Sequence, residues 1–172
     1  AEIRTITNIR GILGTILDLD APLAYKHFGE VQNYTHPDDP SLNWSYDARA
    51  EVGMLSHNIT VQGDIFSPSN GFGGHMMAMG GSTMKAEHIT LYQMGQKGAL
   101  GRYPWHWHVL GNGGAGQYLN NSAIYRSFNR AVTVHATNQT TVSGNVAYDH
   151  IGHGYFFEDG VEVDNVMTGN LG

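Results

Sequence analysis

The sequence contains no cysteine, which excludes disulfide bonds, thiolate metal sites and cysteine nucleophiles. Charged residues are also scarce, at 14% of the chain against about 25% in an average domain. Nine basic residues face fifteen acidic ones and form no basic tract, so a role in nucleic-acid binding is not expected. No apolar run reaches the roughly 18 residues of a membrane-spanning helix, so no membrane span is expected.

Glycine and histidine are the residues present in excess. The 172 residues include 23 glycines, and because glycine tolerates left-handed backbone, we expect many tight corners and no long helices. A hydrophobic content of 41% is enough for a folded core. The ten histidines are the first indication of chemistry.

The chain divides by pattern near residue 50. Residues 1–50 form an N-terminal β segment, in which the proline-rich stretch 35–40 is predicted to be a loop. Residues 51–172 repeat short β-rich runs bounded by glycine, asparagine or aspartate. The chain starts without methionine and ends within this repeating pattern, so we interpret it as a fragment of a longer protein.

Two families of short strands alternate along residues 51–172, with no helical segments of 10–15 residues between them. The first family comprises runs at 57–63, 87–92, 121–125, 140–146 and 164–170, and the second comprises runs at 74–80, 102–109, 130–136 and 154–160. Short strands in a fixed order, separated by turns, are typical of stacked coils. The pattern therefore predicts an all-β parallel β-helix, with a β-sandwich as the alternative.

Alignment of the second strand family separates two faces, because side chains alternate along a strand. Three apolar pairs align on the core side: Trp105 and Trp107, Val132 and Val134, Tyr155 and Phe157. The outward face then carries two columns: His108, His135 and Glu158 in one, with His106, Thr133 and Phe156 beside it. Successive coils lie about 4.8 Å apart, so residues in a column are neighbours.

Histidines and a carboxylate that converge in this way can bind a divalent metal ion. The predicted ligands are His106, His108, His135 and Glu158, with His75 and His153 as further candidates; the ion could be Zn, Cu, Ni, Mn or Fe. Without a metal, the first four residues could act in general acid–base catalysis. A hydrogen-bonded ladder with only a structural role is the alternative.

Basic and aromatic residues flank the histidine strands. Arg102 and Arg130 are predicted to bind a carboxylate or sulfate on a sugar, and Tyr103 to stack on a sugar ring if it is exposed. The alternative is that the arginines of this region pair with Asp149, Asp159 or Glu162. Because they are adjacent, Glu158 and Asp159 are expected to point to opposite faces, which argues against a simple two-carboxylate glycosidase.

Four segments resemble one known family. They are the runs Gly95–His108 (GQKGALGRYPWHWH), Ser127–His135 (SFNRAVTVH), Asn145–Gly160 (NVAYDHIGHGYFFEDG) and the entry strand 51–59. Together they are similar to the region that follows the eight-glycine domain in cell-migration-inducing hyaluronan-binding proteins, transmembrane hyaluronidase and fibrocystin-like proteins. Residues 1–50 resemble the end of that eight-glycine domain more loosely.

The resemblance implies a right-handed parallel β-helix in an extracellular protein associated with hyaluronan or another polysaccharide, with depolymerising activity in some members. Its motifs carry His106, His108, His135, His153, Glu158 and Asp159 onto this chain. The chain departs from the family in three respects. Trp105 and Trp107 replace smaller apolar residues, and cysteines found in many animal members are absent. The net charge of −6 also makes a neutral glycan as plausible a ligand as hyaluronan.

Two functions follow as hypotheses. The first is a secreted or cell-surface enzyme that cleaves a polysaccharide by hydrolysis or elimination at the histidine site. The second is a non-catalytic structural or adhesive segment of a large surface protein or filament. Five sequons are predicted glycosylation sites: Asn33, Asn43, Asn58, Asn120 and Asn138. Open ends of a β-helix expose strand edges, so self-association or flanking domains are expected to cover them.

Overall fold

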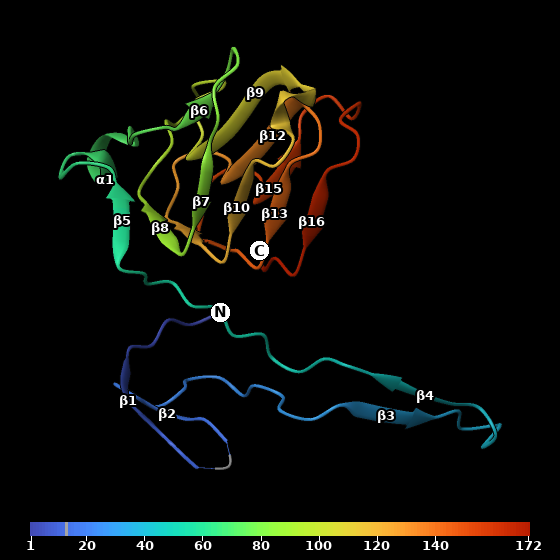
Figure 1. The fold of residues 1–172 in the computed structure, drawn as a ribbon. Helices are drawn as coiled ribbons and strands as arrows, with labels where there is room; N and C mark the ends of the chain where they lie inside the picture. Colours follow the sequence, from blue (N-terminus) through green and yellow to red (C-terminus); the bar gives the residue numbers. More distant parts are fainter. Residues whose placement is uncertain (13) are drawn as a thin grey trace. The chain divides into compact units, whose positions relative to one another are not determined.

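Three parallel four-stranded sheets form the walls of residues 53–172 (Figure 1). The computed structural model describes residues 1–12 and 14–172, in two separate units, Ala1–Val52 and Gly53–Gly172. Each sheet joins strands from successive coils, and every strand pair in the second unit's sheets is parallel. The predicted all-β parallel β-helix is therefore confirmed, and the alternative β-sandwich is wrong.

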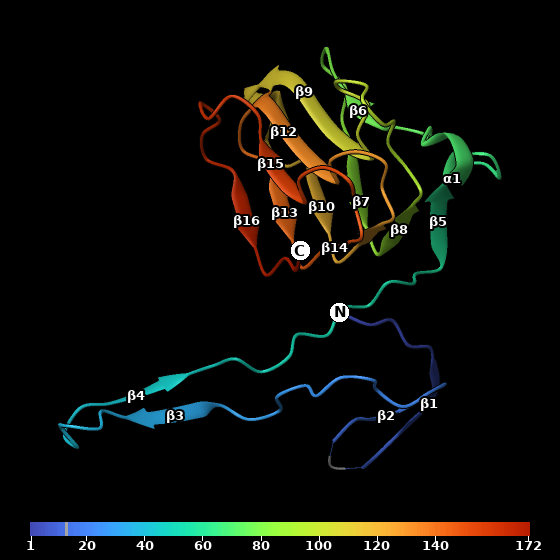
Figure 2. The ribbon, with the colours of Figure 1, turned by 180° about the vertical axis from the view of Figure 1, so that it is seen from behind.

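The strands of the three sheets follow one another in a fixed order along the chain. The first sheet contains β7 (Lys85–Glu87), β10 (Tyr118–Asn120), β13 (Thr141–Ser143) and β16 (Val166–Thr168). The second contains β5 (Ile59–Gln62), β8 (Ile89–Tyr92), β11 (Ala123–Tyr125) and β14 (Val146–Tyr148). The third contains β6 (Met77–Ala78), β9 (Trp105–Gly111), β12 (Val132–Thr137) and β15 (Tyr155–Phe157), and lies along one side of the solenoid in both views (Figure 2).

Each full coil has three strands, whereas the sequence pattern predicted two. The first strand family was a mixture: the runs at 57–63 and 121–125 lie in the second sheet, but the runs at 140–146 and 164–170 provide strands of the first. The corner between these sheets was missed because it is a single left-handed residue, such as His88 (φ 54°) or Asn121 (φ 45°). One such residue turns the chain without any glycine or proline to mark the turn.

The first unit consists of two antiparallel strand pairs. Strand β1 (Ile6–Arg10) pairs with β2 (Ile16–Leu19), and β3 (Gln32–Thr35) pairs with β4 (Asn43–Tyr46). The proline-rich stretch lies in the connection between β3 and β4, as expected for a loop. Helix is limited to α1 (Ser67–Asn70) and the 3-10 turn η1 (Asn112–Gly114), and no helix among the described residues is long and apolar enough to span a membrane.

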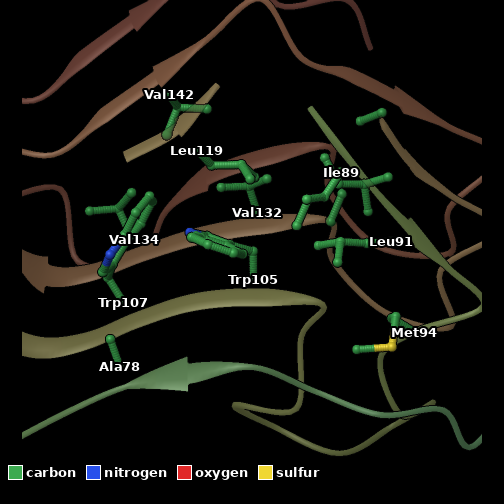
Figure 3. Close-up of a cluster of buried hydrophobic side chains, with 13 residues drawn as sticks. Ala78, Ile89, Leu91, Met94, Trp105, Trp107, Leu119, Val132, Val134 and Val142 are labelled. Carbon is green, nitrogen blue, oxygen red and sulfur yellow. The ribbon is translucent and has the colours of Figure 1, made fainter. Parts of the chain in front are cut away.

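The core of the second unit fills the space between the three sheets. Figure 3 shows these side chains, which include Trp105, Trp107, Val132 and Val134, all fully buried. Strand pairing places Trp105 beside Val132 and Trp107 beside Val134, as the alignment predicted. Phe157 is an exception, with 37% exposure, because β15 is the outermost strand of its sheet among the described residues and no further rung covers it.

Two leucines with opposite environments test the importance of this core. We expect Leu119→Ala to lower the free energy of unfolding by about 2–5 kcal/mol, because Leu119 is fully buried and its loss leaves a cavity between the sheets. Leu100→Ala is the control, since Leu100 is 80% exposed. Chemical denaturation followed by circular dichroism measures both. Equal stability of the two variants would contradict a core centred on Leu119.

Candidate functional site

Three histidines meet on the outer face of the third sheet. His106 and His108 lie two residues apart on β9, so they share one face, and His135 on β12 is the direct neighbour of His108 in the parallel register. The ring centroids of His108 and His135 are 4.8 Å apart, and those of His106 and His108 are 5.0 Å apart. In-register pairing therefore brings the three imidazoles together.

His106 lies on the predicted face but is buried rather than exposed. Its exposure is 1%, because the Tyr103 ring packs 4.8 Å from it and the loop before β9 covers it. The imidazole Nδ1 donates to the carbonyl oxygen of Gly101 over 3.0 Å. Glycine at 101 suits this loop because its φ is 79°, in the left-handed region that other residues avoid.

The burial of His106 keeps its imidazole neutral. Burial is the largest influence on its pKa and lowers it from 6.5 to about 4, and the Gly101 carbonyl opposes this only in part. With Nδ1 donating, the lone pair lies on Nε2, and this buried atom has no hydrogen-bond partner. A neutral imidazole with a buried, unpartnered nitrogen is the form of histidine that binds metals.

The three histidines have the spacing that a metal ion requires. Candidate ligand atoms of His106, His108 and His135 all lie within 4.8 Å of one another. An ion bonded at about 2.0–2.1 Å in tetrahedral geometry would hold its ligand nitrogens about 3.3 Å apart, so modest ring rotations would suffice. Three imidazoles could thus hold a divalent ion and leave one position open for water or substrate.

A second buried polar atom without a partner lies beside His106. Thr133 pairs with His106 in the register, and its buried Oγ1 has no hydrogen-bond partner among the described residues. Buried polar atoms without partners are uncommon in native proteins. The presence of Thr133 Oγ1 and His106 Nε2 on adjacent rungs fits a site that receives a polar ligand.

Glu158 and Asp159 both approach His135, which corrects the expectation that they point to opposite faces. Glu158 Oε2 is 3.9 Å from His135 Nδ1, and Asp159 Oδ2 is 3.2 Å from Nε2. Strand β15 ends at Phe157, so side-chain alternation no longer applies, and Gly160 (φ 72°) continues the turn. The Glu-Asp-Gly sequence is the turn signal from which this could have been anticipated.

Glu158 lies beside the cluster rather than within it. The Arg130 guanidinium is 3.1 Å from Glu158 Oε2 and is held between the rings of Tyr103 and Phe156, 4.9 and 4.0 Å from their centroids. Arg130 also donates to the Tyr103 hydroxyl. Arg130 is therefore engaged within the protein, but its partner is Glu158, which the alternative of intramolecular pairing did not name. Arg126 lies 3.6 Å from Asp149, which that alternative did name.

The remaining predicted site residues lie apart from the three imidazoles. His75 contacts Arg102 over 2.6 Å, and His153 is exposed and stacks on Phe156. Neither belongs to the group of close ligand atoms. Tyr103 is 1% exposed, so the exposure on which its predicted stacking on a sugar ring depended is absent. Arg102 is exposed, with one guanidinium nitrogen engaged by His75.

The sequons differ in how their side chains are used. The Asn138 amide donates to Asn112 and accepts from the Val163 N–H, so both ends are engaged in the stack of coils. Asn33, Asn43 and Asn58 are exposed. Asn120 is half-buried and accepts from the Ser143 hydroxyl. Glycosylation at the five sites stays a prediction.

Comparison with known proteins identifies similar chains. Residues 71–172 match the family described as CEMIP beta-helix. The chain is 40% identical over 166 residues to a cell surface hyaluronidase of Danio rerio, which covers 86% of this chain and 11% of that protein. It is 33% identical over 208 residues to fibrocystin-L of Mus musculus, covering 99% of this chain and 5% of that protein.

A third relative is a G8 domain-containing protein of Dictyostelium discoideum, 36% identical over 166 residues, with 96% of this chain and 13% of that protein covered. The chain thus spans only 5% to 13% of the length of these relatives.

The buried neutral His106 predicts a specific pH dependence of stability in the metal-free chain. Because the folded pKa of His106 is about 4 and its ordinary value is 6.5, the unfolded chain binds a proton between these values and the folded chain does not. Proton uptake therefore favours the unfolded chain: the contribution of neutral His106 to the free energy of unfolding is fully present above pH 6.5 and is lost as the pH falls to about 4. We expect the loss to reach about 3 kcal/mol.

Urea unfolding between pH 7 and pH 4 measures this effect, compared with His106→Gln, which has no titrating group at that position. The variant should lose less stability on acidification than the wild type. His88→Asn is the matched control, since His88 is exposed and asparagine tolerates the left-handed backbone of this corner, and it should retain the pH dependence that His106 contributes. If the free energy of unfolding depended on pH identically in the wild type and in His106→Gln, the effect could not be assigned to His106.

Proposed function

The chain belongs to the CEMIP β-helix family, and on that premise we propose that it is the metal-binding, polysaccharide-cleaving part of an extracellular or cell-surface protein. The substrate class would be hyaluronan-type glycans, as suggested by the names of the two relatives called cell surface hyaluronidase. The observation that carries the proposal is the buried, unpartnered Nε2 of His106 beside His108 and His135.

The histidines would divide the work according to their exposure. His106 is buried and neutral, so its role would be to bind the metal ion and hold it in place. His108 and His135 are half-buried and reach the solvent-facing side, where a glycan could approach. A bound divalent ion would polarise a substrate oxygen or lower the pKa of a water molecule. An imidazole at the open side can transfer a proton to or from the glycosidic oxygen.

The chain as a whole is negatively charged, so an anionic sugar would have to be bound by individual arginines near the site. The chain carries a net charge of −6, but Arg102 is exposed near the start of β9 and can offer its guanidinium to a carboxylate. Arg130 neutralises Glu158 next to His135. Arg102 therefore supports hyaluronan as the first substrate to test, with a neutral polysaccharide as the comparison.

One observation favours the second candidate function, a structural or adhesive segment. His108 and His135 are hydrogen-bonded through their Nδ1 atoms at 2.9 Å, and Asp159 lies on the far side of His135. Such a ladder can exist without any metal. It leaves His106 Nε2 unexplained, however, so we place it second.

Metal content tests the proposed site directly. After exposure to Zn²⁺, Cu²⁺, Ni²⁺, Mn²⁺ or Fe²⁺ and exhaustive dialysis, the wild type should retain close to one ion per chain of at least one of these metals, measured by elemental analysis. His106→Ala and His108→Ala should lose it, because each removes one of three ligands. His88→Asn should retain it. Retention in the His108 variant, or no retention in the wild type, would refute the site.

Depolymerisation tests the activity. Long hyaluronan incubated with the metal-loaded chain should become shorter on size-exclusion chromatography, and His108→Ala should slow this by about 100-fold or more, as expected when a proton-transferring or ligating group is lost. A neutral polysaccharide run in parallel establishes the substrate class. Unchanged chain lengths of both polymers, together with retained glycan binding, would support the non-catalytic alternative instead.

A further inference from the structure

We propose that Asp159 is a positioning residue that selects which nitrogen of His135 faces the metal; the inference rests on the proposed function. Asp159 Oδ2 lies 3.2 Å from His135 Nε2. The contact is electrostatic and not a hydrogen bond, but a negative charge this close to Nε2 favours the tautomer that carries its proton on Nε2 and disfavours a lone pair there. The lone pair of His135 then lies on Nδ1, which faces His108.

A nearby acceptor also fixes the tautomer of His106, but there the proton lies on Nδ1 and the lone pair on Nε2. The Gly101 carbonyl accepts from His106 Nδ1, which leaves Nε2 as the ligand atom. Metal-binding histidines generally place the other ring nitrogen against a carboxylate or a backbone carbonyl. Asp159 and Gly101 are one of each kind. The structure thus points to a site formed by Nε2 of His106 and Nδ1 of His135.

His108 completes the set through its contact with His135. The two Nδ1 atoms are 2.9 Å apart and hydrogen-bonded, so one must donate. With His135 protonated on Nε2 by the influence of Asp159, His108 is the donor in the metal-free chain. Movement of this one proton to His108 Nε2 would free both Nδ1 atoms, which already lie near the ligand spacing of about 3.3 Å expected in a tetrahedral site.

The turn that carries Asp159 is fastened to the strand that carries His135. Glu162 Oε1 accepts from the backbone N–H of Asp159 and from that of Ala136, each over 3.0 Å. Ala136 directly follows His135 and is held in the left-handed region, with φ 42°. One carboxylate therefore links the backbone of Asp159 to the backbone beside His135, so the contact between them does not depend on a free loop.

The Asp159–His135 contact is poorly suited to a purely stabilising role. The Asp159 side chain is 42% exposed, and exposed ion pairs contribute little to stability. If the contact were only structural, removal of the Asp159 side chain would change stability very little and nothing else. If Asp159 positions His135, its removal changes the metal affinity and the protonation pattern of His135. These readouts separate the two interpretations.

The experiment compares Asp159→Ala, Asp159→Glu and, as matched control, Asp149→Asn, an exposed turn aspartate beside Arg126. In the metal-free chain, nitrogen-15 NMR of the imidazoles should show His135 protonated on Nε2 in the wild type and the control, and a mixture of tautomers in Asp159→Ala. The affinity for the metal retained by the wild type, measured by competition with a chromophoric chelator, should fall about 10- to 100-fold in Asp159→Ala. Asp159→Glu should recover part of it.

The midpoint of thermal unfolding should stay within about 2 °C of the wild type in all three variants. Unchanged affinity and an unchanged nitrogen spectrum in Asp159→Ala would overturn the inference. If the wild type binds no metal, the proposed function fails, and the spectrum alone decides the role of Asp159: a tautomer change on its removal supports control of His135, and no change overturns it.

Discussion

The in-register stacking of parallel strands is the constraint on which the rest of this structure depends. Because each strand of the third sheet pairs with its equivalent in the next coil, the residue beside His108 is His135, and the residue beside Trp105 is Val132. One register places aromatic residues inside the solenoid and imidazoles outside. A slip of a single residue in this pairing would exchange the two faces, so core packing and the histidine cluster are set by the same hydrogen bonds.

The sequence allowed this register to be predicted because the third-sheet strands alternate clearly. Trp105 and Trp107, and Val132 and Val134, mark the inward positions without ambiguity, and the histidines occupy the positions between them. The first and second sheets were harder to tell apart. Their strands are only three or four residues long, and corners such as His88 are single left-handed residues other than glycine or proline. Strands of both sheets were therefore read as one family, and β7 and β10 of the first sheet were not recognised.

The parts of the site that the sequence did not reveal lie where strand alternation stops. Burial of His106 and Tyr103 comes from the loop that precedes β9, and no periodicity describes how a loop folds back. Asp159 reaches His135 because the chain has already left β15 and is turning. The separation of His75 and His153 from the cluster has the same origin, since both precede strands rather than lie within them.

A ladder selected only for stability would not be built from these residues. His106 and Thr133 are adjacent, fully buried and each left with an unpartnered polar atom, which costs about 1–3 kcal/mol per atom relative to a satisfied site. Other buried polar groups of the coils are well paired: the Asn145 amide donates to Leu119 and Asn170, and its oxygen accepts from the Ser122 N–H. Trp105 Nε1 in the core and Glu162 Oε2 also lack a hydrogen bond, but neither lies on the histidine strands' outer face beside His106 Nε2. The fold is therefore able to pair its polar groups, yet it leaves His106 Nε2 and Thr133 Oγ1 without partners on neighbouring rungs. A ligand that completes their coordination or hydrogen bonding explains why polar residues occupy these positions.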